Sequence, residues 1–220
     1  MAREHSMVNW QDIDTVLLDM DGTLLDLHYD NYFWLSYLPQ RYANIHGTSL
    51  SQAKKIVENH SHTVRGTLKW YCLDYWSDIL KLDIVLLKKE VQHKIKERPH
   101  CRDFLDFLLV NDKKVALVTN AHPQTLALKL SLTSIGEQLD NIVSSHQFQQ
   151  PKESQIFWEM LHEQLDFDPE RTLFIDDTVQ ILRAAEKFGI KHIMAIHQPD
   201  SQIQRTVDDI PAFYHFDEIM

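Results

Sequence analysis

The sequence is poor in cysteine and glycine and has no long apolar run. Its two cysteines, Cys72 and Cys101, form no C-x-x-C pair, so we expect free thiols and neither a zinc motif nor a redox motif. Five glycines are too few for a flexible linker. The first ten residues lack an apolar run of signal-peptide length, and no stretch reaches the length of a membrane span. These absences predict a cytoplasmic protein with no membrane partner.

Basic residues are also scarce relative to acidic ones. The chain has 22 lysines and arginines against 32 acidic residues, a formal net charge of −10. An acidic surface argues against binding to nucleic-acid polymers and to anionic membranes. A small anionic ligand stays compatible with this charge if a metal ion and a few basic groups set the local field. The expected partner is therefore a small molecule, and the protein a monomer or small homo-oligomer.

Hydrophobic residues make up 44% of the 220 residues, enough for one large domain or for a domain with a smaller one. Residues 13–19 form a short apolar run that is typical of a central strand. Helical patterns then continue without a strand, including one amphipathic helix expected over 67–80. We therefore predict an all-helical insertion at 28–96 within an α/β core formed by 1–27 and 97–220.

An alternation of helices and apolar strands follows Pro99. Such strands imply a parallel sheet covered on both faces, so the predicted fold class is α/β with a doubly wound parallel sheet. Weak periodicity favours a helix in the tail at 208–220. The predicted strands lie at 115–118, 141–144, 172–175 and 191–196. A helix is predicted before them at 102–110, and further helices between them at 123–132, 152–165 and 178–188.

Polar side chains cluster where these strands end. Each alone has an ordinary explanation as a turn, a helix cap or a solvated lysine. Together they would face one crevice, since the carboxyl ends of parallel strands share an edge. Carboxylates supply oxygen ligands for Mg²⁺, a nucleophile, and an acid for the leaving group. The residues are Asp19, Asp21, Thr119, Asn120, Lys152, Asp176 and Asp177.

The segment 19–23 together with Thr119, Lys152 and the pair 176–177 resembles, in order and spacing, the four motifs of the haloacid dehalogenase superfamily of phosphohydrolases. The resemblance covers nearly the whole chain and implies a Rossmann-like core, a mobile cap after the first motif, and Mg²⁺ as cofactor. It implies that Asp19 is the nucleophile and a metal ligand. Asp21 would be the general acid and base, with its backbone carbonyl on the metal. Relatives that displace halide lack this second acid, so phosphate chemistry is favoured.

The same resemblance assigns roles to the other strand-end residues. Thr119, Asn120 and Lys152 would bind phosphate, and Lys152 would also offset the charge of the nucleophile. Asp177 would ligate the metal directly and Asp176 through water, although these two roles are interchangeable at this stage.

Five further segments resemble a bacterial subgroup described as GMP/IMP nucleotidases, which implies a purine 5′-mononucleotide substrate. These segments are 10–12, 30–34, 70–76, 119–123 and 171–177. Residues near the first motif, in the insertion and beside Thr119 are candidates for substrate contact. The helical spacing of Trp70 and Trp76 favours packing inside the insertion over stacking on a base. The candidates are Tyr29, Asn31, Tyr32, Arg65 and His122.

Other functions fit parts of the same pattern. A phosphosugar or phosphoglycolate phosphatase, or a phosphomutase, would use the same core, and the choice of substrate would separate these enzymes. A non-catalytic signalling module such as a receiver domain also combines strand-end acids with a lysine. That module needs a shorter chain without a helical insertion, and it would accept one phosphoryl group without turning over.

The predicted nucleophile can be tested directly. The Asp19→Asn variant should fold but release no phosphate, because an amide cannot form an acyl-phosphate. Phosphate release and circular dichroism, measured on wild type and variant, check both parts. Full activity in a folded variant would contradict the assignment.

Overall fold

The computed structural model describes residues 7–220, and its centre is a sheet of six parallel strands. The strand order is β3-β2-β1-β4-β5-β6, so the first strand of the chain lies in the middle. The predicted doubly wound α/β fold is confirmed. The strands are β1 (Thr15–Leu18), β2 (Lys114–Thr119), β3 (Asn141–Ser144), β4 (Thr172–Asp176), β5 (His192–Ile196) and β6 (Ala212–Phe213).

Alternate side chains of each strand pack into different hydrophobic clusters, one on each face of the sheet. In β1, Val16 and Leu18 belong to one cluster and Leu17 to the other, and all three are fully buried. This explains why the strand reads as a continuous apolar run. Helices α7 (Cys101–Val110) and α8 (Pro123–Leu132) cover the first face, and α10 (Gln155–Leu165) and α11 (Val179–Phe188) cover the second.

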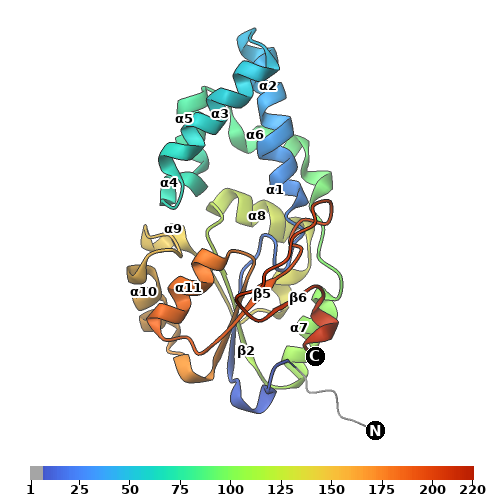
Figure 1. Ribbon diagram of the computed structural model, residues 1–220, viewed down its shortest axis with the longest axis vertical. Helices are drawn as coiled ribbons and strands as arrows, with labels where there is room; N and C mark the ends of the chain where they lie inside the picture. The colour runs from blue at the N-terminus through green and yellow to red at the C-terminus, as the bar shows by residue number, and fades with distance from the viewer. Residues whose placement is uncertain (1–6) are drawn as a thin grey trace.

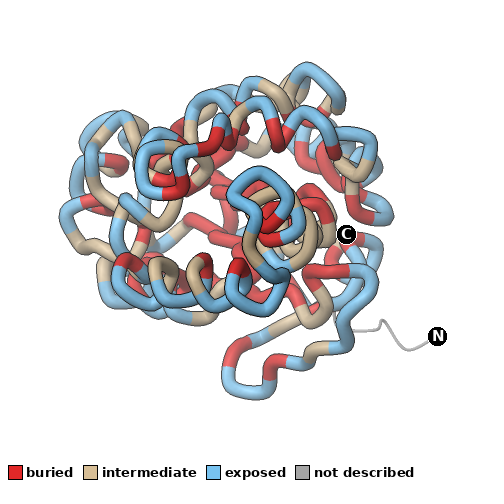
Figure 2. Tube along the Cα trace, turned by 90° about the horizontal axis from the view of Figure 1, so that it is seen from above, coloured by how far each residue is buried: buried red, intermediate tan, exposed pale blue. Residues whose placement is uncertain are grey.

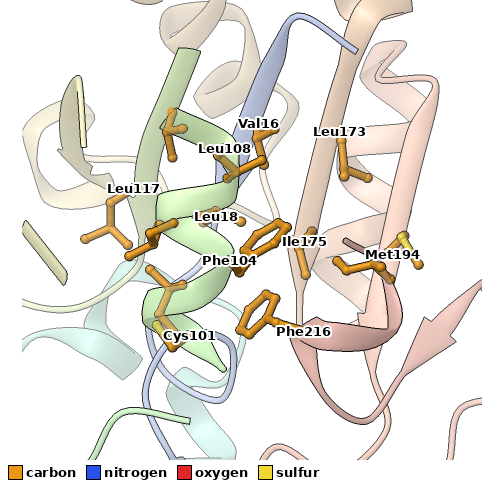
Figure 3. Packing of buried hydrophobic residues seen from close by; sticks show 14 of the residues in the cluster. Val16, Leu18, Cys101, Phe104, Leu108, Leu117, Leu173, Ile175, Met194 and Phe216 are labelled. Carbon is orange, nitrogen blue, oxygen red and sulfur yellow. The ribbon is translucent and has the colours of Figure 1, made fainter. Parts of the chain in front are cut away.

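Aromatic rings carried by α7 and the C-terminal tail fill the first face (Figure 3). Phe104 is fully buried and stacks on Phe216, with ring centroids 4.6 Å apart. Trp10 packs 5.9 Å from Phe104 and donates its indole N–H to the carbonyl of Ile219. The two ends of the described chain are therefore held on the same face of the sheet.

The segment between β1 and α7 forms a helical block with a core of its own. Its buried residues include Phe33, Trp76 and Leu80, and the exposed positions lie on its outer surface (Figure 2). The block comprises α1 (His28–Tyr32), a π-helical turn (Phe33–Tyr37), α2 (Leu38–His46), α3 (Leu50–Val64), α4 (Leu68–Tyr71), α5 (Leu73–Leu80), α6 (Ile84–Glu90) and a short turn (Gln92–Lys94).

Two adjacent segments join the helical block to the sheet. The backbone N–H of Asp26 donates to the carbonyl of Lys96 at 2.9 Å, and Leu25 pairs with Glu97 in an antiparallel bridge. Figure 1 shows the block above α8, at the end of the molecule toward which β1 runs. No helix within residues 7–220 combines the length and the apolar character that a bilayer span needs.

The structure corrects three details of the expected elements. The helix expected over 67–80 is two helices, because Cys72 between them is extended, with φ −85° and ψ 110°. Helix α10 begins at Gln155 and leaves Lys152 in the preceding turn. The tail is not a helix. Instead, β6 pairs with β5 and completes the edge of the sheet, and a short 3₁₀ turn at Phe216–Glu218 follows.

Packing of α7 on the sheet predicts a specific loss of stability. Phe104→Ala should lower the free energy of unfolding by about 3–5 kcal/mol, because it removes a buried ring and leaves a cavity. Leu109→Ala on the same helix is the matched control, since Leu109 is 62% exposed and its truncation should change stability by about 0.5 kcal/mol or less. Urea denaturation measures both variants, and equal midpoints would contradict the packing described.

Candidate active site

The carboxyl ends of three neighbouring strands bring the predicted site residues together. Asp19 directly follows β1, and its N–H donates to the carbonyl of Ile175 at 3.0 Å. Thr119 and Asp176 are the last residues of β2 and β4. The register pairs Leu18 with Leu117 of β2 and with Ile175 of β4, so Asp19 lies level with Asp176, and Thr119 lies one residue further along β2. Chain regions far apart in sequence thus form one crevice.

Lys152 lies at the centre of this crevice and is 1% exposed. Its ammonium contacts Asp19 Oδ1 at 2.5 Å and Asp176 Oδ2 at 2.7 Å, and donates to the carbonyl of Val118 at 2.9 Å. Desolvation lowers the pKa of Lys152, but the two carboxylates outweigh it and leave the pKa raised. The lysine is therefore a fixed positive charge against the predicted nucleophile.

A third carboxylate, that of Asp177, lies beside the two that contact this ammonium. One oxygen each from Asp19, Asp176 and Asp177 lies within 4.8 Å of the others, and all three residues are buried. Burial, reinforced by the neighbouring acids, raises the pKa of Asp19 to about 7, that of Asp176 to about 6 and that of Asp177 to about 7. Even with Arg205, whose Nη1 lies 3.9 Å from Asp177 Oδ2, the carboxylates outnumber the cations beside them. Oxygen ligands with excess negative charge fit a hard divalent cation such as Mg²⁺.

Gly22 makes the close approach of this cluster to the first loop possible. Its φ is +89°, and an added Cβ would lie 2.8 Å from Cγ of Asp177. The loop closes through hydrogen bonds of 2.8 Å from Gly22 N to the carbonyl of Leu25 and from Leu25 N to that of Met20. A side chain at this position would be strained and would displace a carboxylate of the site.

Two further predicted residues organise the loop after β2. Thr119 is 1% exposed, and its hydroxyl accepts a hydrogen bond from Ala121 N at 3.0 Å. Asn120 accepts from the backbone N–H of Lys152 at 3.0 Å and donates to Glu153 at 3.1 Å. Asn120 thus fixes the turn that presents Lys152. Both Thr119 and Asn120 line the cavity at the crevice.

The second acid of the first motif belongs to a separate, partly buried network of charges. Lys129 of α8 contacts Asp21 Oδ1 at 2.5 Å and Asp30 Oδ2 at 2.6 Å, and Lys88 of α6 contacts Asp30 Oδ1 at 2.8 Å. Burial raises the pKa of Asp30, but Lys129 and Lys88 outweigh it and bring the pKa down to about 2. Burial is the largest influence on Asp21, whose pKa stays raised although Lys129 opposes the shift. The network links the predicted acid to the helical block.

Sequence reasoning did not identify Lys129, Lys88 or Asp30 as members of this network. The helical spacing indicates that Lys129 is buried, because it lies three residues after Leu126 and shares the buried face of α8. Lys88 is only 3% exposed, and its ammonium lies 4.7 Å from the centroid of the Phe33 ring. A lysine on the apolar face of a helix is the pattern that marks such residues.

A cavity of about 730 Å³ extends from the crevice into the helical block. Of the predicted substrate residues, Asn31, Arg65 and His122 line it. Asn31 donates to Asp200 at 2.7 Å, and the guanidinium of Arg65 lies 5.9 Å from the ring of Trp70. Polar and aromatic groups therefore surround the far end of the space that begins at Asp19.

Tyr29 and Tyr32 do not line the cavity, contrary to expectation. Tyr29 is 1% exposed within the core of the helical block, and its hydroxyl donates to the carbonyl of Lys88. Tyr32 lies under the ammonium of Lys94, which is 4.1 Å from its ring centroid. Trp76 is buried as expected but also borders the cavity, as does the half-buried Trp70.

Comparisons with known proteins identify the family to which this chain belongs. A family model described as haloacid dehalogenase-like hydrolase matches residues 16–195. The chain belongs to this family. Over 199 residues the hydrolase is 45% identical to the GMP/IMP nucleotidase YrfG of Escherichia coli (strain K12), with 90% of each chain covered. It is therefore a phosphoric monoester hydrolase, as the sequence predicted.

More distant relatives share the fold. The hydrolase is 25% identical over 198 residues to a phosphorylated carbohydrates phosphatase of Thermotoga maritima, covering 84% of this chain and 85% of the relative. A crystal structure of a HAD phosphatase from Thermococcus onnurineus superposes with a TM-score of 0.78 at 20% identity, covering 94% of this chain and 96% of the other. The second likeness shows the fold alone.

The charged network around Lys129 predicts coupling between two residues of the hydrolase. Lys129→Met should destabilise the protein by about 3 kcal/mol, because Asp21 and Asp30 lose their shared cation in a desolvated place. Adding Asp21→Asn should recover part of that loss, because the carboxylate left without a contacting cation is then neutral, whereas Asp30 keeps its contact with Lys88. Urea denaturation of both single variants and of the double variant measures this coupling. Strictly additive free energies would contradict the network.

Proposed function

We propose that the hydrolase is a Mg²⁺-dependent nucleotidase that releases phosphate from purine 5′-mononucleotides such as GMP and IMP. The observation that carries the proposal is the 45% identity to the Escherichia coli GMP/IMP nucleotidase over 90% of both chains. The structure is consistent with it, since one cavity joins the acids at Asp19 to the aromatic side chains of the helical block.

The arrangement of acids suits a two-step transfer through an aspartyl-phosphate. A carboxylate oxygen of Asp19 attacks phosphorus while the bond to the nucleoside 5′ oxygen breaks, and Asp21 donates a proton to that oxygen. Asp21 then takes a proton from water, whose oxygen attacks the acyl-phosphate and releases inorganic phosphate. Lys152 holds Asp19 in position by its 2.5 Å contact and offsets its charge.

Asp19, Asp176 and Asp177 would hold Mg²⁺, with the backbone carbonyl of Asp21. The bound ion would offset the charge of the phosphoryl oxygens. Thr119 and Asn120 would orient those oxygens, because both line the cavity beside Lys152.

The helical block, residues 28–96, would act as the cap that reads the nucleoside. Trp34 and Trp70 line the cavity from the block, and stacking between an aromatic side chain and a base is favourable for every base. Arg65 lies over the Trp70 ring and can donate hydrogen bonds to the carbonyl and nitrogen acceptors of a 6-oxopurine. Closure over the substrate would exclude water from the reacting phosphate.

A phosphorylated sugar is the second candidate substrate. It is favoured by the 25% identity to the Thermotoga maritima carbohydrate phosphatase. The aromatic lining of the cavity favours a nucleotide instead, since a sugar phosphate offers no flat base to stack.

A phosphate-release panel in Mg²⁺ tests the substrate. GMP and IMP should be hydrolysed with a higher kcat/KM than glucose 6-phosphate or ribose 5-phosphate, and a preference for the sugars would contradict the proposal. Arg65→Met should lower kcat/KM for GMP by about tenfold or more, because it removes one charged hydrogen bond to the base. Arg183→Met is the matched control, because Arg183 lies on α11 outside the cavity and pairs with Glu186.

A further inference from the structure

A second group of potential metal ligands lies across the boundary between the helical block and the sheet domain. Cys72 and Asp74 come from the start of α5, and His122 immediately precedes α8. One ligand atom from each lies within 4.8 Å of the other two, and His122 Nε2 is 3.6 Å from Asp74 Oδ2. The group contains sulfur and nitrogen, unlike the all-oxygen cluster of strand-end acids.

Local backbone structure presents these side chains at the boundary. Cys72 is the extended residue that separates α4 from α5, and Asp74 follows in the first turn of α5. His122 is extended, with φ −57° and ψ 142°, at the N-cap of α8. The break at Cys72, which the sequence pattern did not predict, is what brings the thiol to the end of the helical block.

His146 adds an independent observation beside this group. It lies in α9 (Ser145–Phe148), and Figure 1 shows α9 just below the end of α4. Its ring centroid is 5.0 Å from that of His122, and its buried Nε2 has no hydrogen-bond partner among the described residues. A shielded nitrogen without a partner is unfavourable unless a ligand satisfies it. Burial lowers the pKa of both histidines, to about 4 for His146, so both imidazoles are neutral ligands at neutral pH.

We propose that Cys72, Asp74 and His122, with His146 as the fourth donor, form a Zn²⁺ site that bridges the helical block and the sheet domain. Thiolate, imidazole and carboxylate are the ligands that zinc takes in tetrahedral sites. Bond lengths of about 2.0–2.3 Å place such ligand atoms about 3.3–3.8 Å apart, so Cys72, Asp74 and His122 must draw together by about 1 Å. The His122 to Asp74 distance already falls in this range. His146 lies outside this group of three and must move further to bind.

Binding requires one rearrangement of protons. His122 would ligate through Nε2, which moves the ring proton to Nδ1 and gives up the long 3.4 Å hydrogen bond from Gln124 N. The thiol proton of Cys72 is released to solvent as the sulfur binds. Mg²⁺ would not compete here, because it prefers oxygen ligands.

Zinc at this place would hold the helical block against the sheet domain. His122 also lines the cavity that begins at Asp19, so the site lies beside the substrate space. An ion shared by both parts would resist their separation and slow the exchange of substrate and product. The site would therefore make the hydrolase sensitive to free zinc without involving the strand-end acids.

Cobalt provides a test that is specific for sulfur. Co²⁺ added to the Mg²⁺-saturated protein should produce a near-ultraviolet thiolate-to-cobalt band that saturates at about one equivalent. The strand-end acids cannot give this band, since that cluster contains no sulfur. Cys72→Ser should abolish the band, and Cys101→Ala should retain it, because Cys101 is 1% exposed within the core. Absence of the band in the wild type, or its survival in Cys72→Ser, would overturn the proposal.

Zinc affinity supplies a second measurement. Asp74→Asn should weaken Zn²⁺ binding by about 10- to 100-fold in a competition titration against a chromophoric chelator. Asp78→Asn is the control, because Asp78 is an exposed acid on the same helix and pairs with Lys81. Zn²⁺ should also slow turnover of the wild type and leave Cys72→Ser less affected. Equal affinities in the two aspartate variants, or equal inhibition of wild type and Cys72→Ser, would contradict the site.

Discussion

The contact of one buried ammonium with two carboxylates determines how the centre of this protein is built. Lys152 ties Asp19 after β1 to Asp176 at the end of β4, and its donation to Val118 adds β2. A charge of this kind is stable away from water only when its partners are fixed. The parallel register of the three strands supplies that fixation, and the same contacts place a cation against the predicted nucleophile.

The remaining negative charge explains the chemistry that the site can support. Asp177 adds a third buried carboxylate that Lys152 does not contact, and burial, reinforced by neighbouring acids, raises the pKa values of all three. A divalent cation would stabilise such a cluster of buried carboxylates, and the bound cation would offset the charge of a phosphoryl group. Lys129 plays a comparable part for Asp21, but it shares its charge with Asp30 of the helical block. The second acid is therefore connected to the part of the chain that we propose reads the substrate.

Much of the fold could be predicted because its signals are local. Apolar runs such as β1 identified the strands, and the polar residues after them located the candidate site at one edge of the sheet. The errors came where tertiary contacts override local pattern. Within the tail, β6 forms a strand because it pairs with the edge of β5. The Tyr29 ring lies away from the cavity because it packs in the core of the helical block.

The sequence by itself determined the strand-end acids, the lysine and the separate helical insertion, because each depends on residue type and on short-range periodicity. Only the tertiary structure decided which distant charges meet. Lys129 reaches Asp21 across 108 positions of the chain, and Cys72 reaches His122 across the boundary between two packed units. The first contact depends on how α8 packs beside the loop after β1, and the second on how the helical block docks on the sheet domain. Docking is set by the packing of many side chains at once, and no single segment encodes it.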